Sequence, residues 1–349
     1  GHPDAYILRS HKLQGEPLPE SVKAVARAGA GTNNVPVEEY TKKGVVVFNS
    51  PGANANAVKE LVLAGMLLGS RGILPGMEYV STLTHMTDAD EMSKLLEKEK
   101  SNFAGFELAG KTLGIVGLGN VGTRLAYMAK LLGWRVLGYD PFVQREQINQ
   151  VEFNKLLQQA DAISIHVPLT LSGEYPTQHL FNEAAFAAMK PSAILLNSAR
   201  GPVIQQSALM ADIEKTKRQV VLDVFEFEPE IPEILLNMLA LATPHIAGYS
   251  LEGKARGTQM IYEAFCRKFA YPASKQFESP LPSVAPYFEQ QALNAALKQH
   301  LTQIYDIAAD DQQLRDCVQN GKVEQTAFDL LRKNYPLRRE WAAHGGPKA

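Results

Sequence analysis

The sequence contains only two cysteines, Cys266 and Cys317, among 349 residues. Their separation fits neither a metal site nor a redox pair, and two thiols cannot build a disulfide framework, so the chain suits a reducing compartment. No run approaches the roughly 18 uninterrupted apolar residues of a membrane-spanning helix, and the N-terminus lacks a signal-peptide pattern. These absences predict a cytoplasmic protein with no membrane partner.

Metal-binding patterns are also missing from the sequence. It contains no H-E-x-x-H, no C-x-x-C and no carboxylate cluster with metal-ligand spacing, so we expect no metal. The formal net charge of −2 gives no general attraction to nucleic acid or to an anionic membrane. Any phosphate on a substrate must therefore be held by local basic residues.

What the sequence does contain is an alternation of apolar strand-like and helix-like segments. With 45% hydrophobic and 21% charged residues, a chain of 349 residues is expected to form a soluble protein of two or three domains. The alternation predicts parallel α/β layers. We expect strands at 6–10, 44–48, 162–167, 193–197, 220–224 and 241–243, and helices at 54–70, 182–189, 208–213 and 253–269.

The most informative stretch is 111–140, which predicts a strand, a glycine turn, a helix and a second strand ending at an acid. Gly117 allows the tight turn, Gly119 lets a pyrophosphate approach the backbone, and Gly122 lets helix and strand pack closely. A carboxylate at Asp140 can accept hydrogen bonds from both hydroxyls of an adenosine ribose. The alternative is a glycine-rich turn that only packs. The expected dinucleotide contacts in this stretch are Gly117, Gly119, Asn120, Val121, Gly122 and Asp140.

Three polar residues follow predicted strands farther along: Arg200, Glu228 and His245. Ligands of open α/β sheets collect at such strand ends. Hydride transfer from a 2-hydroxy acid needs a guanidinium to grip the carboxylate, an imidazole to take the hydroxyl proton, and a carboxylate to stabilise the imidazolium. Each residue alone also has an ordinary interpretation: a surface salt bridge, a solvent-facing turn residue and a hydrogen-bonded loop histidine. His166 ends a predicted buried strand, and we expect it to pack near the nicotinamide rather than react.

Together, GLGNVG, NSARGPVI (197–204), DVFEFEP (223–229) and TPHIAG (243–248) resemble the D-isomer-specific 2-hydroxyacid dehydrogenases over nearly the whole chain. The resemblance implies that NAD is the cofactor, and that Arg200 orients the substrate carboxylate, His245 is the acid/base and Glu228 is its partner. It also implies cofactor contacts by Asp140, Val167, Asp223 and Gly248. The implied fold is a Rossmann-type NAD-binding domain with a flavodoxin-like substrate domain.

The two halves resemble different branches of that family. Residues 4–143 are similar to the D-3-phosphoglycerate dehydrogenases, and residues 151–341 are similar to the erythronate-4-phosphate dehydrogenases. The second stretch is the one that distinguishes better between the two branches. Either branch implies a small phosphorylated hydroxy acid as substrate: 4-phospho-D-erythronate in pyridoxal 5′-phosphate biosynthesis, or D-3-phosphoglycerate in serine biosynthesis. An NAD-binding regulator without activity is an alternative of another class. The expected substrate contacts are Arg9, Ser10, Gly29 and Tyr249, and Lys12 is either a phosphate partner or a solvated surface lysine.

The resemblance also divides the chain into domains. A substrate domain is expected at 1–70 with a return helix at 253–275, an interdomain segment at 71–106, and the NAD-binding domain at 107–250. A partial, small C-terminal α+β dimerisation unit is expected at 279–341, which implies a homodimer. The family's first strand and helix are missing before residue 4, so the substrate domain is expected to be N-terminally truncated, with its first strand at an uncovered sheet edge.

Overall fold

A computed structural model describes residues 2–276, 281–282 and 305–344 of the chain. These residues divide into two compact units: one from 2–58, 248–276, 281–282, 305 and 336–344, and another from 59–247 and 306–335. We call them the first and second unit and describe each by itself. Among the described residues, no helix is both long and apolar enough to cross a lipid bilayer.

The second unit contains a seven-stranded sheet in which all strands are parallel, in the order β10-β9-β8-β7-β4-β5-β6. This order confirms the predicted Rossmann-type α/β fold. The strand order switches between β4 and β7: β5 and β6 are added on one side of β4, and β7 to β10 on the other. The carboxyl ends of β4 and β7 are therefore the expected ligand position. The strands are β4 (Thr112–Val116), β5 (Arg135–Tyr139), β6 (Asn149–Gln150), β7 (Ala162–Ile165), β8 (Ile194–Asn197), β9 (Val220–Leu222) and β10 (Leu241–Ala242).

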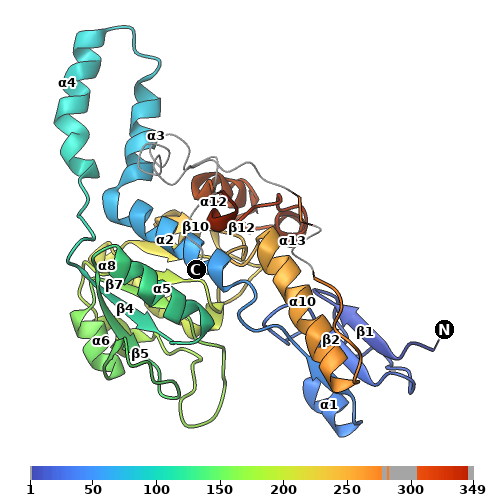
Figure 1. The fold of residues 1–349 in the computed structure, drawn as a ribbon. Coiled ribbons are helices and arrows are strands. Elements are labelled where there is room, and N and C mark those ends of the chain that lie inside the picture. The colour runs from blue at the N-terminus through green and yellow to red at the C-terminus, as the bar shows by residue number, and fades with distance from the viewer. Residues whose placement is uncertain (1, 277–280, 283–304, 345–349) are drawn as a thin grey trace. The chain divides into compact units, whose positions relative to one another are not determined.

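Helices pack on this sheet, and Figure 1 shows α5 running along β4 and β5. Strands β4, β7, β8 and β9 are buried along their full length, as expected of parallel strands covered on both faces. The elements are α2 (Ala55–Arg71, which begins in the first unit), α3 (Ile73–Leu83), α4 (Ala89–Glu99), η1 (Lys100–Phe103), α5 (Asn120–Leu131), α6 (Phe153–Gln159), α7 (Glu183–Ala188), η2 (Gly201–Val203), α8 (Gln206–Thr216) and α9 (Glu233–Met238).

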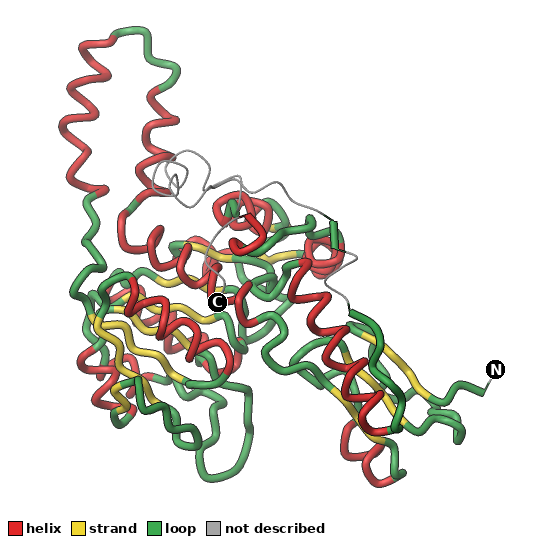
Figure 2. Tube along the Cα trace, in the orientation of Figure 1, coloured by secondary structure: helices red, strands yellow, loops and turns green. Residues whose placement is uncertain are grey.

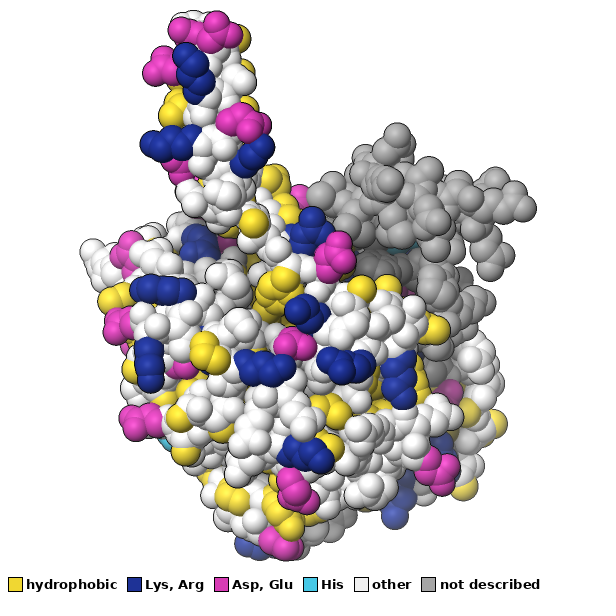
Figure 3. Space-filling model, turned by 90° about the vertical axis from the view of Figure 1, so that its left-hand side faces the viewer, with side chains coloured by type: hydrophobic (Ala, Val, Ile, Leu, Met, Phe, Trp, Pro, Cys, Tyr) yellow, Lys and Arg dark blue, Asp and Glu magenta, His cyan; other side chains and the backbone are white. Residues whose placement is uncertain are grey.

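The segment between Ile73 and Phe103, which lies within the expected interdomain segment, forms a hairpin of α3 and α4. Asp88 accepts hydrogen bonds from the backbone of Asp90 and Glu91 and so caps α4. Charged side chains of both signs and hydrophobic side chains share the surface of this hairpin in Figure 3, and Met77 is 62% exposed.

The second unit also includes a C-terminal segment, residues 306–335. It consists of α12 (Ile307–Arg315), β11 (Val318–Gln319), β12 (Lys322–Val323) and α13 (Gln325–Lys333). The Asp311 carboxylate accepts a hydrogen bond from the backbone of Ala242 at 2.6 Å, and Val323 N donates to Ile231 O at 2.9 Å. These bonds attach the segment to β10 and to the loop before α9. The remaining part of the tail, 283–304, lies outside the described residues.

The first unit contains a three-stranded parallel sheet in the order β1-β2-β3. Among the described residues, β1 forms one edge, and its Ile7 is 73% exposed. Figure 2 shows the expected return helix, α10, beside these strands, where Ile261 packs against Ala26 and Ala28. The elements are β1 (Ala5–Leu8), β2 (Ala24–Arg27), α1 (Val37–Lys42), β3 (Val46–Phe48), α10 (Leu251–Lys268) and η3 (Trp341–His344).

Candidate active site

An imidazole and a carboxylate meet at the carboxyl ends of β9 and β10. His245 Nδ1 lies 2.7 Å from Glu228 Oε1, and Phe225 N donates to Glu228 Oε2 at 3.2 Å. Burial alone would raise the pKa of Glu228, but the hydrogen bond and charge of His245 outweigh it and lower the pKa. The carboxylate therefore stays ionised near neutral pH and carries no proton to donate. Nδ1 must then be the donor, which leaves Nε2 free to accept a proton.

The loop that carries His245 is held by Asp223. One carboxylate oxygen accepts hydrogen bonds from Thr243 Oγ1 at 2.7 Å and from Ile246 N at 2.8 Å, and the other accepts from Ala247 N at 3.0 Å. His245 itself has a φ of 57°, a left-handed conformation that L-residues with side chains rarely adopt. Three bonds from flanking residues hold this conformation. Burial raises the pKa of Asp223 to about 6, although His245 and the hydrogen bonds act against that shift.

Arg200 lies in the same unit, just beyond β8. Asn197 shapes the turn between them: its side chain donates to Arg200 O at 2.9 Å and accepts from Ala199 N at 3.0 Å. Burial lowers the pKa of Arg200, and the charge of Glu228 counteracts part of that shift. The structure thus brings together the three residues that the sequence predicted as catalytic.

The glycine turn after β4 has the geometry that its residue types require. Gly117 has a φ of 96°, and a Cβ there would lie 2.7 Å from His166 O. A Cβ on Gly122 would lie 1.9 Å from Gly117 O, so helix and turn touch directly. At Gly119 a Cβ would meet nothing within 4 Å, which leaves the backbone open to a ligand. This arrangement fits a pyrophosphate at the N-terminus of α5.

The remaining predicted cofactor residues of the second unit lie around this turn. Asn120 and Val121 begin α5, and a Cβ on Gly117 would also lie 3.0 Å from Val167 Cγ1. Asp140 follows β5 and accepts from the backbone of Leu118 at 2.8 Å, so the acid is tied to the turn. These positions agree with a dinucleotide site, while the individual contacts to NAD stay predictions.

The predicted substrate residues and Gly248 belong to the first unit. Arg9 and Ser10 follow β1, where Arg27 Nε donates to Arg9 O at 3.2 Å. Partial desolvation lowers the pKa of Arg9, and Tyr249 acts in the opposite direction. Lys254 Nζ lies 5.2 Å from the centre of the Tyr249 ring. A Cβ at either Gly29 or Gly248 would lie 2.0 Å from a side-chain nitrogen, of Arg27 and Asn54 respectively, so that neighbouring side chain would have to move.

Sequence reasoning missed several residues of this region. Asn197 was read only as the end of a strand, and Asp223 only as a cofactor contact, although its hydrogen bonds hold the His245 loop. Ser198, next to Asn197, has a buried hydroxyl with no hydrogen-bond partner within the described part of the chain, a polar atom available to a ligand. His166 was expected to pack, and it lies 2.8 Å from Ser164 Oγ. Within the described residues, no cluster of His, Cys, Asp and Glu could hold a metal ion.

Comparison with protein families agrees with this geometry. Residues 77–247 match the family model described as D-isomer specific 2-hydroxyacid dehydrogenase, NAD binding domain. Residues 281–344 match a second family model, Domain of unknown function (DUF3410).

Individual proteins give the same result. The chain is 56% identical over 348 residues to a protein of Acinetobacter baumannii named Erythronate-4-phosphate dehydrogenase, covering 99% of this chain and 89% of that protein. Among solved structures, Rhodotorula graminis D-mandelate dehydrogenase is similar with a TM-score of 0.65 and 28% identity, covering 79% of this chain and 83% of the other. The NAD+-bound 3-phosphoglycerate dehydrogenase of Entamoeba histolytica matches with a TM-score of 0.59 and 26% identity, covering 76% and 79%.

Proposed function

Because this chain belongs to the D-isomer-specific 2-hydroxyacid dehydrogenase family and is an NAD-dependent dehydrogenase, we propose that it oxidises 4-phospho-D-erythronate to 2-oxo-3-hydroxy-4-phosphobutanoate. The named relatives support this substrate. The observation that carries the proposal is the 2.7 Å pairing of His245 Nδ1 with Glu228 Oε1, with Arg200 beside Glu228. We further propose that this step serves pyridoxal 5′-phosphate biosynthesis.

The residues divide the work as follows. Arg200 grips the substrate carboxylate, because a guanidinium can donate two parallel hydrogen bonds to it. His245 Nε2 takes the proton of the C2 hydroxyl, and Glu228 stabilises the imidazolium that forms. NAD, when bound at the glycine turn, supplies the acceptor for the hydride from C2. Substrate contacts by Arg9, Ser10, Gly29 and Tyr249, and cofactor contacts by Asp140, Val167, Asp223 and Gly248, are part of the proposal.

Domain assignment and assembly are also proposals. We assign 1–70 with the return helix to the substrate domain, 107–250 to the NAD-binding domain, 71–106 to the segment between them, and 279–341 to a dimerisation unit. The protein would be a homodimer, which light scattering during gel filtration tests. A cytoplasmic location is supported by the two cysteines, which are both free.

The decisive experiment compares initial rates of NADH formation with 4-phospho-D-erythronate and with D-3-phosphoglycerate. We expect a higher kcat/KM for the former; a preference for the latter would overturn the substrate. NADH binding without oxidation of either acid would instead indicate a regulator. His245→Ala should lower kcat by about 10²–10⁴, the usual contribution of a positioned acid/base, and leave the Kd for NADH nearly unchanged. Turnover like that of the wild type in this variant would refute the role of His245.

A further inference from the structure

A second histidine–carboxylate pair lies beside the catalytic one. We propose that Glu226, fixed by His179 and by the start of α8, is a positioning residue that sets Arg200 and Glu228 relative to each other. The inference rests on the proposed function, because it concerns how that reaction's residues are placed. Neither Glu226 nor His179 has a role in the reaction as described above.

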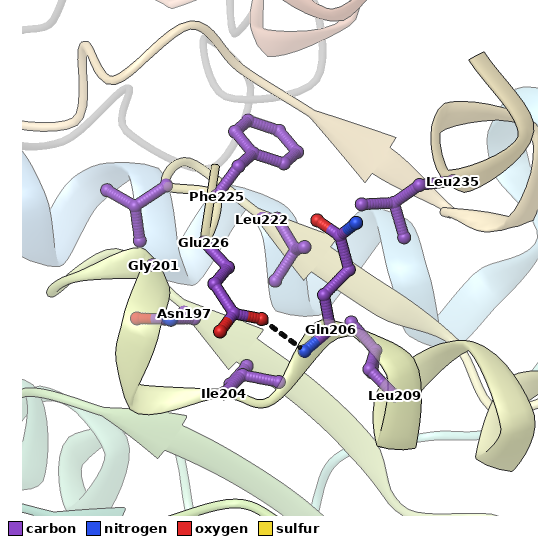
Figure 4. Close-up of a pocket in the computed structure, with 10 residues that line it drawn as sticks. Asn197, Gly201, Ile204, Gln206, Leu209, Leu222, Phe225, Glu226 and Leu235 are labelled. Atoms are coloured by element: carbon purple, nitrogen blue, oxygen red, sulfur yellow. Dashed lines mark hydrogen bonds between the residues drawn. The ribbon is translucent and has the colours of Figure 1, made fainter. Parts of the chain in front are cut away.

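Both carboxylate oxygens of Glu226 are engaged. His179 Nε2 lies 2.5 Å from Oε1, and Gln206 N donates to Oε2 at 2.7 Å. Figure 4 shows this carboxylate pointing at the first turn of α8. The Glu226 side chain is 11% exposed and that of His179 is 37% exposed, so solvent screens the pair only in part. The pair is therefore better shielded than an ordinary surface ion pair.

The contact with α8 replaces a missing local cap. Gln205, at the N-cap position, makes no side-chain hydrogen bond to the helix. An acid at a helix N-terminus satisfies a free N–H group and interacts favourably with the helix dipole. Glu226 supplies that acid from a loop twenty positions later in the chain. The start of α8 and the loop after β9 are thus held together by one side chain.

These contacts lie between the two catalytic residues. Gly201, which follows Arg200, packs so closely on the loop that a Cβ would lie 1.9 Å from Phe225 O. Glu226 comes next, and Glu228 is two residues farther on. A shift of the loop after β9 would therefore move the Glu228 carboxylate relative to the Arg200 guanidinium.

The segment that carries His179 also contacts these two segments, the loop after β9 and the stretch between Arg200 and α8. His179 N donates to Pro202 O at 2.8 Å, and Phe181 N donates to Val203 O at 3.0 Å. His179 also has a φ of 52°. A side-chain-bearing residue keeps this conformation when its surroundings enforce it, and such residues gather at functional sites. His245, in the catalytic pair, has the same unusual conformation.

The test compares Glu226→Gln and His179→Gln with a control, Glu230→Gln. Glu230 lies in the same loop, but its side chain is 65% exposed and pairs 3.4 Å from Lys322. With 4-phospho-D-erythronate, we expect kcat to fall about tenfold in Glu226→Gln and His179→Gln, as for loss of one charge-assisted hydrogen bond. The double variant should lose no more than Glu226→Gln alone, because that substitution already removes the contact that His179→Gln removes. NADH affinity and the control should stay within about twofold of the wild type.

A second measurement does not depend on the substrate. The proton shared by His245 Nδ1 and Glu228 should give a far-downfield proton NMR signal, assigned by its loss in Glu228→Gln. We expect this signal to move upfield in Glu226→Gln and to stay in place in Glu230→Gln.

Three results would overturn the inference. They are an unmoved signal, an unchanged kcat, or equal losses of kcat and NADH affinity, which would indicate a purely structural role. Should Glu226→Gln fail to fold, His179→Gln alone decides, because its side chain is the more exposed. Wild-type enzyme inactive on the phosphorylated acid would contradict the proposed function, while the NMR comparison would still decide the positioning role.

Discussion

Replacing Glu228 with glutamine removes a negative charge beside His245 while nearly preserving the side-chain volume. Oxidation places a proton on the imidazole, so this charge stabilises the transition state more than the ground state. Two unit charges about 4 Å apart interact by about 4 kcal/mol at an effective dielectric constant of about 20. The side chains of His245 and Glu228 are 29% and 26% exposed, and screening by solvent reduces the interaction. We take roughly 2–3 kcal/mol as the remainder, which predicts a fall in kcat of roughly 30- to 150-fold.

The assay is the initial rate of NADH formation with saturating 4-phospho-D-erythronate, measured across the pH range in which histidine titrates. Without the carboxylate the imidazolium is less stable, so the limb in which activity rises with pH should move to lower pH. The Kd for NADH, from fluorescence titration, should change little, because no part of the glycine turn is altered. A kcat within about threefold of the wild type, with an unmoved limb, would refute the idea that Glu228 acts through charge on His245.

Three further predictions concern other parts of the second unit. Arg200→Lys should lower kcat/KM by at least tenfold, because lysine cannot form the paired hydrogen bonds; steady-state kinetics measures this, and an unchanged value contradicts it. Gly122→Ala places a Cβ 1.9 Å from Gly117 O and should abolish NADH binding, which fluorescence titration measures. An affinity for NADH near that of the wild type would disprove the packing argument. Burial lowers the pKa of His166 to about 3. Below about pH 6.5 the imidazole is therefore protonated in the unfolded chain but not in the folded chain, so the free energy of unfolding should fall as the pH drops. The loss is at most about 1.4 kcal/mol per pH unit. Urea unfolding of His166→Gln at several pH values should not show this fall in stability, and a fall equal to that of the wild type would contradict the prediction.

Much of the second unit follows from local patterns in the sequence. The glycine turn was predictable because Gly117 and Gly122 answer steric demands that only a hydrogen side chain meets, as the 1.9 Å approach at Gly122 shows. The positions of Arg200, Glu228 and His245 followed from a general rule, since residues after parallel strands gather at one edge of the sheet.

Pairings between distant segments were not predictable in the same way. The loop after β9 contains two glutamates two residues apart, and no local rule says that Glu226 caps α8 while Glu228 pairs with His245. Likewise, the hydrogen bond from Ala242 to Asp311 joins residues 69 positions apart, with no signal in either segment. Such contacts depend on the packed structure, and no periodic pattern in the sequence encodes them.

The attachment of the C-terminal segment to the sheet has a practical consequence for anyone who trims this protein. Leu314, Val323 and Phe328 are no more than 2% exposed and belong to the same apolar core as β7, β8 and β9. An expression fragment cut at the borders of the matched NAD-binding family model, 77–247, would expose to water the apolar core residues that pack against Leu314, Val323 and Phe328. Such a fragment should precipitate or require detergent, whereas co-expression with a peptide spanning 306–335 offers a way to restore it.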